Sequence, residues 1–291
     1  MNIRIILTIV AFVCISLNVT AQETPYTWRV SQDETRYIYA DTAYVRASPD
    51  TKQSPLDTLL LGQEVKALET TEKTLSLKRL DLPWVKVTYS KNGEEKSGYI
   101  WQGLLSFPQI RRGETKFIFG VERMVDTTVT YEDGNKAVQH KFVIKLKIAV
   151  ADKLTTSSQW KIPADESSGF SQTKVMSGLG LSNVQHIIVI SFGGEACGIA
   201  TEYYYHALTT DGRLMSLPSR MEVGDAGVYY HTESFVFPAE KNGRPDIITK
   251  ETEEGEDTEK TDKQGNVIYK ITRSSVGWIW DSTTGYKEIK K

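Results

Sequence analysis

The segment HKFVIKLKIAV, residues 140–150, constrains the fold of this chain most, because apolar and charged side chains alternate along it. The apolar set is Phe142, Ile144, Leu146 and Ile148, and the basic set is Lys141, Lys145 and Lys147. A period of two residues is typical of a half-buried β-strand, whereas a helix has a period of about 3.6 residues. We therefore expect a strand with its apolar face in a core and its lysines on the other face.

Turn signals extend this expectation to the whole chain. They separate β-rich runs at Asn92-Gly93, Asp133-Gly134, Asp211-Gly212, Asn242-Gly243 and Gly265-Asn266. The run VQHIIVISF, residues 184–192, is apolar through its middle and predicts a central strand that is buried on both faces. No stretch of similar length carries a convincing helical stripe. The hydrophobic fraction of 40% is near the average for folded proteins. The sequence predicts an all-β protein.

The N-terminus has the layout of a secretory signal peptide. Residues 1–21 contain one basic side chain, Arg4, then an apolar run, then a small-residue end that predicts cleavage after Ala21. The apolar run is too short for a stable membrane span. We therefore expect an exported protein of the periplasm or the cell exterior. The formal charge of −2 gives no basic excess, so we expect no nucleic-acid partner.

The remaining chain divides into a lead-in and two domains. Residues 22–36 are polar, and residues 37–108 contain about five short strands, which predict a small barrel. Residues 114–291 contain roughly ten strands and predict a larger antiparallel β domain, either a sandwich or a partial propeller. The acidic run 250–266 predicts a break in this pattern and an exposed hairpin tip. Trp278 and Trp280 should point to one face of their strand.

The N-terminal domain is similar to the bacterial SH3 domain. Four pieces carry the resemblance in the correct order: VRASP (45–49), LLLGQEV (59–65), WVKV (84–87) and GYIWQGL (98–104). Two features depart from the family pattern. Tyr99 replaces the usual tryptophan, and the insertion ETTEKTLSLKRLDLP lengthens the loop before Trp84, which borders the usual groove. The resemblance covers about a quarter of the chain and implies a small SH3-like barrel.

The resemblance also implies binding of cell-wall peptide or glycan (peptidoglycan), or of a protein peptide. Flat rings supply contact area at low entropy cost, and a guanidinium group can hold a carboxylate. The candidate groove residues are Tyr44, Arg46, Trp84, Tyr99 and Trp101. The alternative is that the tryptophan rings belong to the core. The expected core residues are Val45, Leu60, Val65, Val85, Val87 and Ile100.

The stretch SFGGEACGIATEYYYH, residues 191–206, raises an enzymatic alternative, because bacterial SH3 domains often accompany cell-wall cysteine peptidases. Such an enzyme needs a thiolate near a helix N-terminus and a histidine. The residues after Cys197 favour a strand, which would separate Cys197 from His206 by about 30 Å. His231 could approach Cys197 only through the fold. The alternative reading of Cys197 is a small side chain near a glycine-rich turn.

These observations predict an exported, non-enzymatic binding protein of the bacterial envelope. The four histidines lack metal-ligand spacing, so we expect no metal and no cofactor. The first alternative is a cell-wall cysteine peptidase that uses Cys197 with His231. The second is a purely structural assembly subunit, which would expose a large apolar patch instead of an aromatic groove.

Overall fold

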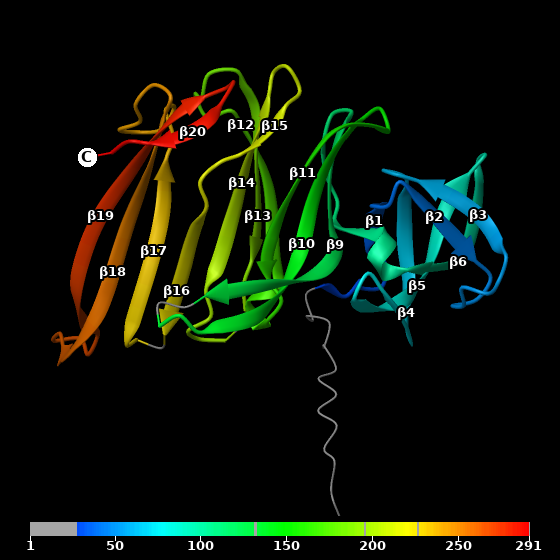
Figure 1. The fold of residues 1–291 in the computed structure, drawn as a ribbon, viewed down its shortest axis with the longest axis horizontal. Coiled ribbons are helices and arrows are strands. Elements are labelled where there is room, and N and C mark those ends of the chain that lie inside the picture. The colour runs from blue at the N-terminus through cyan, green and yellow to red at the C-terminus, as the bar shows by residue number, and fades with distance from the viewer. Residues whose placement is uncertain (1–27, 131–132, 195, 226, 291) are drawn as a thin grey trace, which may run out of the picture.

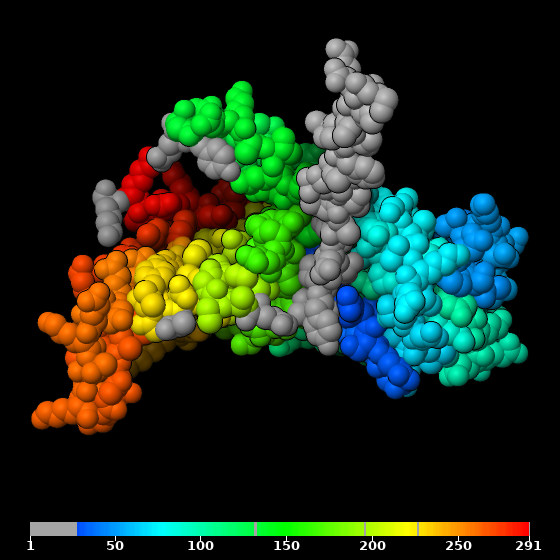
Figure 2. Space-filling model, turned by 90° about the horizontal axis from the view of Figure 1, so that it is seen from below, coloured from blue at the N-terminus to red at the C-terminus, as the bar shows by residue number. Residues whose placement is uncertain are grey.

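The computed structural model describes residues 28–130, 133–194, 196–225 and 227–290, and the expected leader and its cleavage site lie outside them. Apart from short 3₁₀ turns, the regular structure is β-strand, and every strand pair is antiparallel (Figure 1). The prediction of an all-β protein is confirmed. Within the described residues, no helix is long and apolar enough to cross a membrane. Figure 2 shows an elongated molecule with the N-terminal strands at one end and the C-terminal strands at the other.

The first sheet forms the small N-terminal domain and has the strand order β3-β2-β6-β5-β4-β1-β7. Its strands are β1 (Thr35–Ile38), β2 (Thr42–Arg46), β3 (Pro55–Leu60), β4 (Glu64–Leu77), β5 (Leu80–Lys91), β6 (Glu94–Trp101) and β7 (Leu105–Pro108). The curled sheet encloses an apolar core that contains Val45, Val85 and Ile100. One expected core residue is wrong. Leu60 is 56% exposed, and its neighbour Leu59 is buried, because β3 turns the odd-numbered residue inward there.

The second sheet has the order β11-β10-β9-β8, and the third has the order β12-β13-β14-β16-β17-β18-β19-β20 with β15 beside β14. The strands of the second sheet are β8 (Ile110–Arg112), β9 (Thr115–Thr130), β10 (Lys136–Val150) and β11 (Lys153–Pro163). Those of the third are β12 (Phe170–Ser177), β13 (Val184–Phe192), β14 (Thr201–Thr209), β15 (Leu214–Ser216), β16 (Arg220–Asp225), β17 (Tyr229–Val236), β18 (Ile247–Thr261), β19 (Val267–Asp281) and β20 (Gly285–Glu288).

The second and third sheets share one core, as in a sandwich. The apolar side chains of β10 that the alternation predicted, such as Ile144 and Leu146, lie in the same cluster as Ile188 and Ile190 of β13. The opposite face of β13 packs in a separate cluster that contains Ile187 and Trp280. β13 is therefore buried on both faces, as its sequence predicted.

Two expectations from charged residues are wrong. Lys147 is buried although it lies on the lysine face of β10, because the N-terminal domain covers that face. The acidic run is no break, because most of it forms the strand β18, which pairs with β17 on one side and with β19 on the other. Only the turn near Asp262 matches the expected hairpin tip.

Candidate functional site

The five predicted groove residues lie on one outer face of the first sheet. Strand pairing places Arg46 opposite Tyr99 and Trp84 opposite Trp101. Tyr44 lies two residues before Arg46 on β2 and therefore points to the same side. The intervening residues, which include Val45, Val85 and Ile100, point into the barrel core. The fold thus brings the five predicted side chains together as one band, which we call the outer band.

One end of the outer band is covered by the rest of the protein. Trp84 and Trp101 are only 3% and 2% exposed, and both rings belong to the core that the second and third sheets share. The Trp101 indole Nε1 donates a hydrogen bond to the Leu82 carbonyl oxygen at 3.1 Å. These rings contact a ligand only if the domains separate.

The insertion that departs from the SH3 pattern explains this covering. It extends β4 and β5 into a long hairpin whose turn residues, Lys78 and Arg79, both have positive φ. The hairpin lies against β9, because the Met124 amide donates to the Lys78 carbonyl oxygen at 3.1 Å. Lys78 pairs with Glu122 at 2.9 Å, and Arg79 pairs with Asp126 at 2.8 Å. The insertion is therefore a clamp onto the second sheet.

Further polar contacts, at the buried Lys147 and at Glu122, reinforce this interface. The Lys147 Nζ donates to the Tyr39 carbonyl oxygen at 3.0 Å and to Asp41 Oδ1 at 2.7 Å. The Tyr39 hydroxyl donates to Glu122 Oε2 at 2.7 Å. Burial works to raise the pKa of Glu122, but hydrogen bonds from Tyr39 and Lys78 lower it overall, so the carboxylate stays charged. A buried charge without such partners would be costly.

The other end of the outer band is open to solvent. Tyr44 is 50% exposed, and the Arg46 Cζ atom lies 5.8 Å from the centre of its ring. The Lys86 Nζ atom lies 5.9 Å from the centre of the Tyr99 ring, so two cations accompany two aromatic rings. The Arg46 guanidinium also donates to the Gln53 carbonyl oxygen, which holds it against the neighbouring loop. This open end can stack on a flat group and donate hydrogen bonds to a carboxylate or carbonyl.

The residues of the enzymatic alternative have different surroundings. Cys197 is exposed in a turn between β13 and β14, and a strand follows it, so it does not begin a helix. Both ring nitrogens of His231 face carboxylates, with Nδ1 2.9 Å from Glu254 and Nε2 3.5 Å from Glu233. His206 is buried, and neither of its ring nitrogens has a hydrogen-bond partner among the residues that the structure describes.

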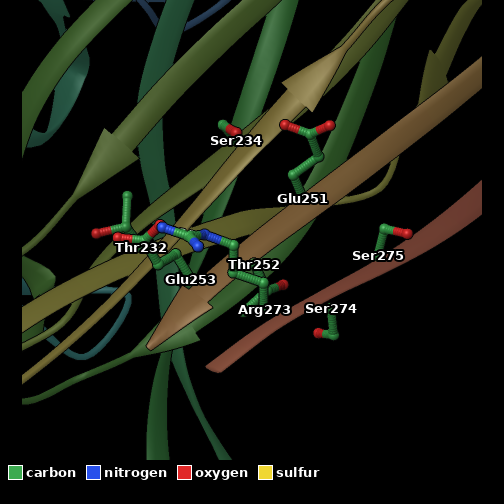
Figure 3. A pocket seen from close by; sticks show the side chains of 8 residues that line it. All are labelled: Thr232, Ser234, Glu251, Thr252, Glu253, Arg273, Ser274 and Ser275. Atoms are coloured by element: carbon green, nitrogen blue, oxygen red, sulfur yellow. Dashed lines mark hydrogen bonds and ion pairs between the residues drawn. The ribbon is translucent and has the colours of Figure 1, made fainter. Parts of the chain in front are cut away.

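A second candidate site, which the sequence did not indicate, lies on the third sheet. A hollow of about 770 Å³ is lined by side chains of β17, β18 and β19 (Figure 3). Its charged members include Glu251, Glu253 and Arg273. β18 is polar at almost every position, so its sequence does not mark which residues line the hollow. The hollow can be recognised only from the register that places residues of the three strands side by side.

Comparison with known proteins bears on the first domain. Residues 41–106 match the bacterial SH3 domain model. No curated protein and no solved structure matches the chain. The matched segment spans β2 to β6 and the first half of β7, and it contains the whole outer band. Residues 41–106 of this chain therefore form a bacterial SH3 domain.

Proposed function

We propose that this protein is an exported, non-enzymatic binding protein of the bacterial envelope. Its SH3 domain recognises cell-wall material, or otherwise a protein partner, through the open end of the outer band. The observation that carries this proposal is the grouping of the exposed Tyr44 with Arg46 on one face, beside the partly buried Tyr99. The Arg46 guanidinium is already held by its hydrogen bond to the Gln53 carbonyl oxygen and lies over the Tyr44 ring, so it loses little side-chain freedom on binding.

The proposal limits the contact to that open end. Trp84 and Trp101 then stabilise the domain interface and do not touch the ligand. Cell-wall peptides carry carboxylates, which the Arg46 guanidinium binds in a charge-assisted hydrogen bond. The surroundings of His231 also support binding over peptidase chemistry. Both of its ring nitrogens face carboxylates, so neither faces the Cys197 thiol.

Co-sedimentation with isolated peptidoglycan tests the proposal. Purified protein beginning at residue 22 should pellet with the polymer at low and at moderate salt. Tyr44→Ala and Arg46→Ala should each reduce the pelleted fraction several-fold. Two variants on other sheets match the chemical changes and should pellet like the wild type: Tyr286→Ala removes an exposed ring, and Lys153→Ala removes an exposed cation.

Two results would contradict the proposed wall binding. The first is wild-type protein that stays in the supernatant, which would leave a protein partner as the function of the open end. The second is equal pelleting of all four variants, which would place the wall contact elsewhere on the molecule.

A further inference from the structure

The hollow on the third sheet is built by the alternation of three neighbouring strands. Two cross-strand rows point to the same face: Thr232–Glu253–Arg273 and Ser234–Glu251–Ser275. Figure 3 shows the Arg273 side chain extending toward Glu253 beside Thr232, with Ser234 and Glu251 in the neighbouring row. The two rows place hydroxyl, carboxylate and guanidinium groups next to one another on one surface.

The charged groups of this hollow are held in position before any ligand arrives. Glu253 Oε1 accepts a hydrogen bond from the Tyr230 hydroxyl at 2.7 Å, and Oε2 accepts one from Arg273 Nε at 2.8 Å. The hydrogen bond from Tyr230, followed by that from Arg273, lowers the pKa of Glu253, so this carboxylate is ionised at neutral pH. The Arg273 side chain is 69% exposed, which leaves its outer N–H groups accessible.

An aromatic ring lies next to the hollow, because the Tyr230 hydroxyl donates to Glu253, which lines it. The Tyr230 ring occupies the space beside Gly255 on the adjacent strand, because a Cβ atom added to Gly255 would lie 2.1 Å from that ring. Tyr269 meets the same ring edge-on, with the ring centres 5.2 Å apart. The absence of a side chain at Gly255 therefore lets an aromatic surface lie level with the polar rows.

The surface continues beyond the other end of the hollow. A second hollow of about 460 Å³ adjoins it at Ser275 and is lined by Arg244, Thr249, Gly277 and Glu288, among others. The distance along β19 from the Tyr230 row to Gly277 spans six residues, or roughly 20 Å at strand rise. The two hollows form one extended groove, which we call the β19 groove; its first part is polar, and its second part also includes the apolar side chains of Val276 and Ile289.

We propose that the β19 groove binds a neutral, hydroxyl-rich oligosaccharide. Vicinal hydroxyl groups both donate and accept hydrogen bonds, and the groove offers carboxylate acceptors beside guanidinium donors. The Tyr230 ring supplies a flat apolar surface for one face of a sugar ring.

The charge of the groove excludes other ligand classes. Glu251, Glu253 and Glu288 are offset by only two cations, Arg244 and Arg273, so the groove has no positive excess to hold an anionic polymer. Its two central rows also contain no apolar pocket for the side chains of a bound peptide.

This site does not depend on the proposed function of the SH3 domain, because it lies on a different sheet. Testing the same variants in both assays distinguishes a failure of the oligosaccharide site from a failure of the proposed SH3 function. Tyr44→Ala should weaken peptidoglycan pelleting and leave oligosaccharide binding unchanged. Variants of the β19 groove should weaken oligosaccharide binding whatever the result of the pelleting experiment.

Isothermal titration calorimetry on the full exported chain tests the inference, with three neutral tetrasaccharides as probes: maltotetraose, cellotetraose and tetra-N-acetylchitotetraose. At least one should bind saturably. Arg273→Ala and Glu251→Ala should each weaken that binding at least tenfold. The Glu251 side chain has no hydrogen-bond or ion-pair partner among the described residues, and its backbone pairing with Ser234 and Ser275 is kept in an alanine variant, so the fold should stay intact. Lys270→Ala, a cation of the same strand on the opposite face, should bind like the wild type.

Three outcomes would overturn the inference. In the first, none of the three tetrasaccharides binds to the wild type. In the second, one binds, but Glu251→Ala and Arg273→Ala retain wild-type affinity while circular dichroism shows them folded. In the third, an extended peptide displaces the sugar at lower concentration than the sugar itself requires, which would make the groove a peptide site.

Discussion

His206 offers a direct physical test of the shared core between the second and third sheets. Its ring lies on β14, 2% exposed, with its centre 4.6 Å from that of the Trp160 ring. Within the described part of the chain, neither ring nitrogen has a hydrogen-bond partner. Burial lowers the pKa of His206 from 6.5 to about 4, because the charged imidazolium cannot be solvated there.

The sign of the effect follows from proton binding in the two states. Below pH 6.5 the unfolded chain binds a proton at His206, but the folded chain binds it only below about pH 4. The contribution to stability is therefore complete above pH 6.5 and falls as the pH drops from 6.5 to 4. The full loss is about 3 kcal/mol, from about 1.4 kcal/mol for each unit of pKa difference. About 2 kcal/mol of it should be lost between pH 7 and pH 5.

Replacement by phenylalanine keeps the ring and removes the titration. Urea unfolding at pH 7, 6, 5 and 4.5 measures the free energy of unfolding of the wild type and of His206→Phe. Carboxylates contribute equally to the pH dependence of both proteins, so the difference between the two isolates the histidine. The variant should gain about 2 kcal/mol relative to the wild type on going from pH 7 to pH 5. Parallel pH profiles for the two proteins would refute the reasoning.

Two further substitutions test the interface between the SH3 domain and the second sheet. Lys147→Met removes two hydrogen bonds and leaves the Tyr39 carbonyl oxygen without this donor, so it should lower the free energy of unfolding by about 1–3 kcal/mol in urea titrations. Gly103→Ala would place a Cβ atom 2.2 Å from the Trp101 ring and should lower the melting temperature by several degrees. Gly224→Ala, which meets nothing within 4 Å, should melt like the wild type, and equal melting of both alanine variants would contradict the packing at Trp101.

The strands of the SH3 domain were predictable because their signals are local. Alternation along β5 and β6 identifies Val85 and Ile100 as inward-facing, and their burial agrees. The prediction that Leu60 is buried was wrong because residues 59–61 are all leucine. Side-chain type therefore does not show which of them face the core and which face solvent. Only the pairing of β3 with β2 determines which leucine faces the core.

The contacts between domains were not predictable from local patterns. Lys147 has the sequence environment of an exposed lysine, and its burial arises from Tyr39 and Asp41, more than a hundred residues earlier. The β19 groove has the same origin, because Glu253 and Arg273 become neighbours only when the register of β18 and β19 is known. Period-two alternation predicts a face, but it does not predict which other side chains share it.

The clamp formed by Lys78 and Arg79 also affects how the protein engages an extended polymer. A flexible linker would let the SH3 domain search a wide volume, whereas this hairpin and the common core around Trp84 hold it in one orientation. The outer band and the β19 groove are then two attachment points at a fixed spacing. Rigid bivalent contact raises avidity only where the polymer presents its own groups at that spacing. The protein would thus select for the repeat distance of its target as well as for its chemistry.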